Sequence, residues 1–161
     1  MDWTGTGCAS VRFNVRGVDC YLSVEQVREV LLTPPITRIF RAAPFVHGVV
    51  NIRGEVIPVL DPGMLLGIGA HGDPTPPHML VLLEIEDHVV ALASGGEIGV
   101  RPLQPDELSA PPVDLSIDAT DCVLGIVSPG ESGRGPGLFL DGHRILSLPP
   151  LEALRSGAEH V

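Results

Sequence analysis

Residues 48–61 read GVVNIRGEVIPVLD, and this stretch decides how the rest of the chain is interpreted. Two apolar runs, at 49–52 and 56–60, flank a polar turn at 53–55 that contains a glycine. Two such runs joined by so short a turn predict a β-hairpin. Because both runs are almost continuously apolar, we expect strands that are covered on both faces, as in a small closed barrel. Pro58 should then lie at a sheet edge or at a bulge.

Strand-like segments recur on both sides of this hairpin. Residues 11–15 alternate between apolar and polar side chains, which is the period of a strand with one buried face. Further segments of this kind are separated by turn residues, and they lie at 20–24, 79–85, 89–93, 98–103, 122–127 and 138–140. Many short strands joined by glycine- and proline-rich turns predict an all-β fold.

Helical structure is expected in two places only. Val24, Val27, Val30 and Leu31 have helical spacing, so we expect a short helix or helical turn within 24–32, ended by two prolines. Residues 149–155 can form a short C-terminal helix with proline in its first turn.

The end of the chain is predicted to hold a last hairpin before that helix. Residues 138–140 and 145–148 are its strands, and Asp141-Gly142 is a favoured turn dipeptide between them.

Charge and composition limit the kinds of partner. The formal net charge is −10, and all ten basic residues are arginines. A chain this acidic is poorly suited to nucleic acid or to an anionic membrane surface, so protein partners are favoured. Without lysine, there is neither a phosphate-binding P-loop nor a Schiff-base residue.

The cellular location is expected to be the cytoplasm. The three cysteines Cys8, Cys20 and Cys122 are widely spaced and odd in number, which fits a reducing compartment better than a disulfide framework. Residues 1–10 do not read as a signal peptide, and no apolar run approaches the ~20 residues that span a bilayer.

The sequence gives little support for an active site or a metal site, and we expect no catalytic residue, no metal and no cofactor. Ser94 and His88 could be offered as a nucleophile and its base, but Ser94 is not in a Gly-x-Ser-x-Gly elbow and no orienting acid is specified. A small hydrolase therefore stays open only if a pocket gathers these groups with an acid. The histidines show no metal-ligand spacing, and they lie at His47, His71, His78, His88, His143 and His160.

Arg53 is the residue of the hairpin that most needs an explanation. It could simply be solvated at a polar hairpin tip. Its planar guanidinium also suits a protein interface, where it can bind a carboxylate through two hydrogen bonds.

The sequence at 48–61 closely resembles the CheW family of chemotaxis coupling proteins, whose pattern is a Gly-Val-x-Asn-Leu-Arg-Gly hairpin followed by Ile-Pro-x-x-Asp. The resemblance extends over nearly the whole chain, through the segments around Phe13, 27–30, 37–39, 79–93 and Gly125-Ile126. It implies an all-β fold of two intertwined five-stranded SH3-like β-barrels that share a core, with a short C-terminal helix. It implies no catalytic site.

Composition indicates the internal boundary of the domain, because residues 67–78 are dominated by Gly, Pro, His and Asp without periodicity and predict a loop between two subdomains. We expect a flexible N-terminus at 1–10, a single CheW-like domain at 11–155 and a tail at 156–161. Within the domain, the first subdomain should be mainly 11–66 and the second mainly 79–140, with strands shared between them and a linker at 67–78.

The implied function is a non-enzymatic scaffold recruited to receptor arrays. One surface would bind the regulatory domain of a CheA-type histidine kinase, and a groove would bind the cytoplasmic tip of a methyl-accepting chemoreceptor. The matching positions are Val27 and Glu29 for the kinase. The receptor-binding positions would be Arg53, Val30, Glu97 and Val100.

Two departures from the family pattern suggest a divergent member. Residues 94–100 carry Gly95 where relatives have aspartate and Glu97 where they have an apolar residue, and a carboxylate there would oppose docking of an apolar helix. Asp61-Pro62-Gly63 replaces the more common run of aspartate, apolar residue and arginine. We therefore expect altered receptor or kinase choice. The alternative is an accessory protein with this fold that binds only one of the two partners.

Overall fold

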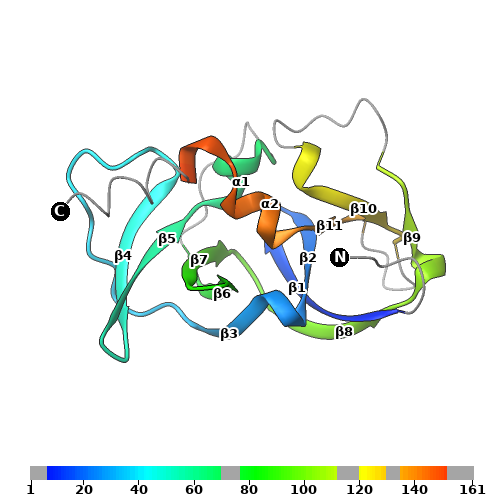
Figure 1. The fold of residues 1–161 in the computed structure, drawn as a ribbon, viewed down its shortest axis with the longest axis horizontal. Coiled ribbons are helices and arrows are strands. Elements are labelled where there is room, and N and C mark those ends of the chain that lie inside the picture. The colour runs from blue at the N-terminus through cyan, green and yellow to red at the C-terminus, as the bar shows by residue number, and fades with distance from the viewer. Residues whose placement is uncertain (1–6, 70–76, 112–119, 130–134, 152–161) are drawn as a thin grey trace.

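The computed structural model describes residues 7–69, 77–111, 120–129 and 135–151, and the description below is restricted to them. Strands dominate, so the expected all-β class is confirmed (Figure 1). They form two sheets, of six and five strands. In spatial order the first sheet contains β8 (Gly99–Leu103), β1 (Cys8–Val15), β2 (Val18–Ser23), β11 (Gly137–Leu140), β10 (Val123–Val127) and β9 (Leu108–Ser109).

The second sheet contains, in spatial order, β3 (Val27–Leu32), β6 (Met79–Ile85), β7 (His88–Ser94), β5 (Glu55–Leu60) and β4 (Val46–Ile52). The hairpin predicted from 48–61 is its β4–β5 pair, which turns at 53–54. Strand β5 pairs with β7 only at Val59 and Leu60, so Pro58 has β4 as its one paired neighbour. A proline tolerates this place because no second ladder needs its missing N–H.

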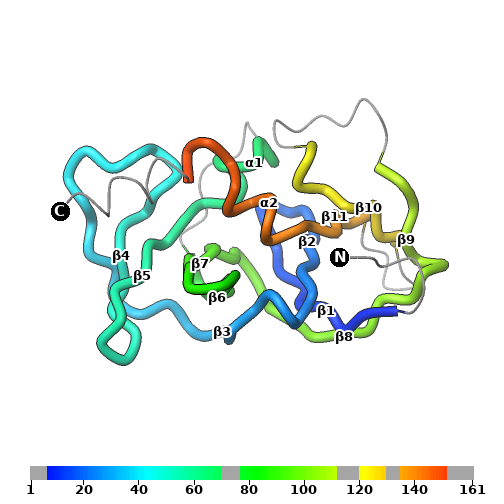
Figure 2. The backbone as a smooth tube through the Cα atoms, in the orientation of Figure 1, coloured from blue at the N-terminus to red at the C-terminus, as the bar shows by residue number. Residues whose placement is uncertain are grey.

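The two sheets exchange segments of chain. The first sheet takes β1 and β2 from before residue 67 and β8–β11 from after residue 78, and the second takes β3–β5 and β6–β7 from the same two parts. Figure 2 shows the crossings from β2 to β3 and from β7 to β8 running along the same side of the molecule. The segment 67–78 connects α1 (Pro62–Leu66) to β6, and its residues 70–76 lie outside the described part. Strand β1 begins at Cys8, earlier than the 11 that we expected.

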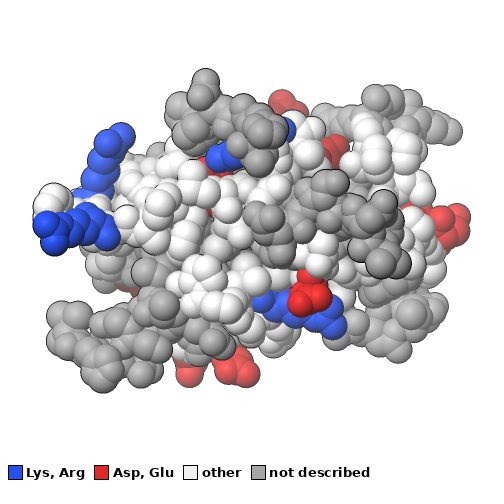
Figure 3. Space-filling model, turned by 90° about the horizontal axis from the view of Figure 1, so that it is seen from above, with Lys and Arg blue, Asp and Glu red and all other residues white. Residues whose placement is uncertain are grey.

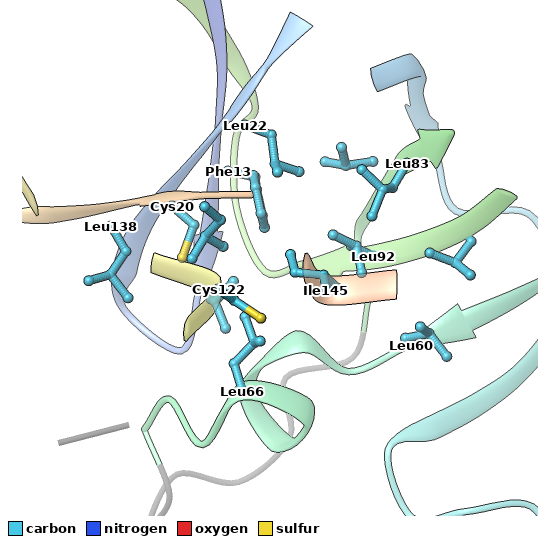
Figure 4. Packing of buried hydrophobic residues seen from close by; sticks show 14 of the residues in the cluster. Phe13, Cys20, Leu22, Leu60, Leu66, Leu83, Leu92, Cys122, Leu138 and Ile145 are labelled. Carbon is cyan, nitrogen blue, oxygen red and sulfur yellow. The ribbon is translucent and has the colours of Figure 1, made fainter. Parts of the chain in front are cut away.

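Alternate side chains of a central strand pack in two different hydrophobic cores. In β6, Val81 and Leu83 pack in a core shared by both sheets, whereas Leu80 and Leu82 pack in a smaller core within the second sheet. The shared core also receives Phe13 from β1 (Figure 4).

Burial on both faces was predicted for the two runs of the hairpin, 49–52 and 56–60, and it is wrong for most of them. Asn51 is exposed and Val56 is 64% exposed, and only Val59 and Leu60, where β5 pairs with β7, are consecutive buried residues.

The helix or helical turn expected within 24–32 is largely wrong. Only Val24–Gln26 form a 3₁₀ turn, which is capped by Ser23, and β3 follows from Val27. The spacing of the apolar residues at 24, 27, 30 and 31 fits a helix, but in the structure β3 is paired with β6 along its length. Pairing within the sheet overrides the local pattern.

The last hairpin is also wrong. Strand β11 is followed by helix α2 (Gly142–Leu146), and Asp141 is the N-cap residue, whose carboxylate accepts a hydrogen bond from the His143 N–H at 2.9 Å. Asp61 does the same for α1, accepting from the N–H groups of Gly63 and Met64. At both places, the aspartate that directly follows a strand is the N-cap residue of a short helix. The expected C-terminal helix begins at 149 and is helical through 151, where the described part ends.

Arg16 links the two sheets. Its guanidinium donates to Asp61 Oδ2 at 3.0 Å and to the Gly69 carbonyl at 2.9 Å, and both side chains of the ion pair are about nine-tenths buried. A Cβ atom at position 63 would lie 2.6 Å from Arg16 Nε. Gly63, one of the departures from the family pattern, thus leaves the space in which Arg16 lies.

The cysteines give the fold a predicted pH dependence. Burial raises the pKa of Cys20 far above its ordinary value of 9.0 and that of Cys122 to about 11. The unfolded chain ionises these thiols at lower pH than the folded chain, so it binds fewer protons above about pH 9 and the free energy of unfolding should fall as pH rises from there.

Urea unfolding between about pH 8 and about pH 10 measures this fall in stability. Cys122→Ala should reduce the slope after correction for its own loss of packing. An equal slope in the variant would contradict the assignment to Cys122.

Candidate functional site

The turns of two hairpins share the pattern Asn-x-Arg-Gly, at 14–17 and 51–54. In both turns the arginine and the glycine have positive φ, at 49° and 86° in the first and at 51° and 84° in the second. In both, the glycine N–H donates to the asparagine Oδ1, at 3.0 and 2.9 Å. Positive φ at both central residues is the geometry of a type I′ turn. The same backbone therefore presents two arginines, of which Arg16 points inward and Arg53 outward.

Arg53 forms an ion pair across the second sheet. Its side chain is 70% exposed, and its guanidinium donates to the carboxylate of Glu29 on β3. Strands β3 and β4 are the two edges of this sheet, so the bond joins one edge to the hairpin at the other. The sheet must curve strongly for these edges to meet, as barrel closure requires.

Arg28 makes a second link between the same elements. It lies at the bulge of β3 opposite β6, where Val27 and Glu29 pair with Leu83 and Leu82. Its guanidinium donates to Glu84 on β6 and, at 2.7 Å, to Glu55 at the start of β5. These hydrogen bonds raise the pKa of Arg28. We call the pairs Arg53–Glu29 and Arg28–Glu55 the edge ion pairs.

The structure thus brings together two residues that the resemblance assigns to different partners, Arg53 and Glu29. No pattern in the sequence connects them, because they are 24 positions apart and lie on strands that are not neighbours in the sheet. The two side chains meet only because the sheet curves and brings its opposite edges together.

The apolar positions assigned to the interface differ in exposure. Val30 is 39% exposed and Val100 is 68% exposed, whereas Val27 is half-buried and packs against the shared core. Leu32, which the resemblance did not single out, follows Val30 on the outward side of β3 and is 67% exposed. Alternation along β3 was the signal that could have identified Leu32.

Glu97 and Val100 lie in or next to the first sheet, apart from the edge ion pairs. Val100 is on β8, an edge strand, opposite Val11. Glu97 is exposed and lines a hollow of about 570 Å³ together with Arg12 and Asp19, whose charged groups are 3.6 Å apart. Figure 1 shows β3 and β8 on the same side of the molecule, so Val30 and Val100 belong to elements of one side.

The hydrolase arrangement is not assembled. Ser94 is fully buried, accepts from the Asn14 N–H and contacts the carbonyls of Asn14 and Gly96. His88 is at the other end of β7, which places it about 20 Å away at the rise of a strand. The serine holds the end of β7 to β1 and has no contact with the histidine.

Clusters of metal-ligating side chains and membrane-spanning helices are both absent from the described ranges. No three His, Cys, Asp or Glu side chains there are grouped so that they could hold a metal ion, and His71 and His160 fall outside those ranges. In the same ranges, no helix is long and apolar enough to cross a membrane.

Comparisons with known proteins agree on one family. The model of the CheW-like domain matches residues 10–149. A protein of Rhizobium etli named probable chemotaxis protein CheW is 26% identical over 149 residues, which cover 92% of this chain and 88% of that protein. Chemotaxis protein CheW of Rhizobium meliloti is 32% identical over 89 residues, covering 55% and 57%.

A solved structure has the same fold. It is the crystal structure of scaffolding protein TtCheW from Thermoanaerobacter tengcongensis, with a TM-score of 0.72 and 25% identity over 89% of this chain and 95% of that one. The family match covers most of the chain, including both sheets and the hairpin that carries Arg53. The chain therefore belongs to the CheW-like family of chemotaxis coupling proteins.

Proposed function

We propose that the protein is a non-enzymatic cytoplasmic adaptor that bridges the tip of chemoreceptors and the regulatory domain of a CheA-type histidine kinase. The observation that carries this proposal is the Arg53–Glu29 pair. It joins the hairpin tip to β3, so Arg53, proposed to contact the receptor, lies next to Glu29, proposed to contact the kinase. A link of this kind can pass a rearrangement of receptor helices to the kinase as a change in orientation.

The kinase is proposed to contact β3 around Val27 and Glu29. Glu29 is partly exposed and could accept a further hydrogen bond, whereas half-buried Val27 would act mainly by supporting the strand. The receptor is proposed to contact Arg53, Val30, Glu97 and Val100. Exposed apolar side chains flanked by an arginine are typical of the energetic centre of an interface.

Bridging is tested by binding each partner alone and both together. We expect immobilised kinase regulatory domain to retain a receptor-tip fragment only when this protein is present. Retention of one partner but not of the other would instead support the accessory protein that binds a single partner. Ordinary affinity for a standard receptor tip would contradict the altered partner choice inferred from Gly95 and Glu97.

The apolar contact with the receptor gives a specific prediction. Val100→Arg should weaken binding of the receptor-tip fragment by about tenfold or more, because a charge would be desolvated in place of an apolar anchor. Its binding to the kinase domain should change little, since Val100 lies on the first sheet, away from Glu29. Isothermal titration calorimetry with the receptor-tip fragment and with the kinase domain measures the two affinities. Met64→Arg, at an exposed apolar residue on α1, is the control. Equal weakening by both variants would remove Val100 from the receptor site.

A further inference from the structure

The loop between β3 and β4 exposes an unusual pair of side chains. Phe40 is 86% exposed, the highest value among the large apolar residues of the described chain, and Ile39 beside it is 48% exposed. Arg41 lies over the Phe40 ring, with 5.2 Å between its guanidinium carbon and the ring centroid. An exposed aromatic ring next to an arginine is the composition of an interface hot spot.

The charges of this loop are also unusual. Six arginines of the described chain form an ion pair with a carboxylate, and they are Arg12, Arg16, Arg28, Arg53, Arg101 and Arg144. Within the same residues, Arg38 and Arg41 have no such partner. In a chain with a net charge of −10, two unpaired guanidinium groups three positions apart form a local positive patch. Figure 3 shows arginine side chains projecting from the end of the molecule where β4 and this loop lie.

The backbone holds the patch in place. Thr37 and Val49 exchange two hydrogen bonds, of 2.8 and 2.9 Å, and the Val46 N–H donates to the Ala43 carbonyl at 2.9 Å. Arg41 has a φ of 61°, a left-handed conformation that is uncommon for a residue with a side chain. This turn and the hydrogen bonds that flank it fix the direction in which the chain presents Phe40 and Arg41.

From these observations we propose that Ile39, Phe40, Arg38 and Arg41 form a docking site for an acidic protein segment that carries an apolar side chain between carboxylates. The apolar side chain packs on Phe40, and the carboxylates pair with the two free arginines. The site goes beyond the proposed function, because its loop lies away from Arg53. The loop runs from Thr37, which pairs antiparallel with Val49 in the middle of β4, to the first residue of that strand, Val46, whereas Arg53 follows its last residue.

A membrane is the weaker occupant. Two basic residues near an anionic surface contribute only about 1 kcal/mol each, and lipid-binding patches usually contain roughly 4–8 of them. The remainder of this acidic chain would be repelled by the same lipids.

The test is selection from a displayed library of random peptides on the intact protein. Enriched peptides should carry at least a pair of acidic residues next to an apolar one. A representative peptide should bind about tenfold or more weakly to Phe40→Ala and to Arg38→Ala, and its affinity should fall as salt is raised. Arg144→Ala and Met64→Ala, at exposed residues elsewhere, should leave its affinity unchanged.

Arg41→Gly separates docking from folding. Glycine adopts a φ of 61° without strain, so the thermal midpoint should not fall, whereas peptide affinity should fall about tenfold. Enriched peptides without carboxylates, or peptides whose binding survives the Phe40 and Arg38 variants, would overturn the proposal. So would an affinity for vesicles of phosphatidylcholine and phosphatidylserine that the same variants abolish.

Discussion

Asp61→Ala is expected to lower the free energy of unfolding by about 3–5 kcal/mol, the range found when one partner of a buried ion pair is removed. The substitution leaves the guanidinium of Arg16 buried, and Arg16 Nε already has no hydrogen-bond partner in the described structure. It also removes the cap that accepts the N–H groups of Gly63 and Met64. Equilibrium unfolding in urea measures the loss.

Asp141→Ala is the matched control for this loss. Asp141 caps α2 as Asp61 caps α1, but its partner from another element is the neutral amide of Gln26, whose Nε2 donates to Asp141 Oδ1 at 3.3 Å. Asp141 also forms an ion pair with Arg144 at 3.6 Å, but this arginine is 56% exposed, so the pair contributes little. We therefore expect a loss nearer the value of a helix cap with one neutral hydrogen bond, about 1–3 kcal/mol. Equal losses in the two variants would show that capping, and not the buried ion pair, dominates at Asp61.

Arg16→Ala and Arg53→Ala extend the comparison to the two Asn-x-Arg-Gly turns. Both arginines have nearly the same backbone conformation, so the difference between the variants isolates the side chains. Arg16→Ala should cost about 3 kcal/mol or more, whereas Arg53→Ala, at a mostly exposed ion pair, should cost about 0–1 kcal/mol. A loss of several kcal/mol for Arg53→Ala would mean that the edge ion pairs are needed to fold the second sheet.

The parts of the fold that the sequence predicted well are those in which one local pattern has one meaning. The hairpin at 48–61 combines two strand-like runs with a turn that only a positive φ satisfies, and β4 and β5 lie where this pattern places them. For the position of this hairpin, packing and local preference agree. Its continuous apolar runs also predicted burial on both faces, which holds only at Val59 and Leu60, where β5 pairs with β7.

Local patterns with two meanings were misread. Residues 24–32 fit a helical period, but pairing with β6 makes most of them a strand. Asp141-Gly142 fits a hairpin turn, but it begins helix α2. The parallel place of Asp61 before α1 was visible in the sequence as a repeated aspartate after an apolar run, and it could have corrected the second error.

The contacts of the candidate site could not be derived from the sequence. Glu29 meets Arg53 because the sheet curves, and Arg16 meets Asp61 because the chain crosses between sheets. Neither partner is within helical or cross-strand reach of the other. The family resemblance assigned interface roles to Glu29 and Arg53 separately, and these roles stay predictions.

Charge reversal at the edge ion pair is the variant with the largest expected effect on function. Arg53→Glu places two carboxylates, at 29 and 53, next to each other, so the hairpin tip should move away from β3. We expect the yield of the complex of receptor tip, adaptor and kinase domain to fall by at least about tenfold, a change of about 1.4 kcal/mol. Stability should change far less, because Arg53 is mostly exposed. Analytical gel filtration of the three-component mixture measures the yield.

The double variant Glu29→Arg with Arg53→Glu distinguishes positioning from direct contact. It restores an ion pair between β3 and the hairpin with the charges exchanged, so a role in positioning predicts partial recovery of the three-component complex. If Arg53 instead binds a receptor carboxylate directly, receptor binding stays lost in the double variant while kinase binding can be measured on its own. Normal assembly by the single Arg53→Glu variant would contradict both roles. The edge ion pair would then be a surface contact of the barrel without influence on coupling.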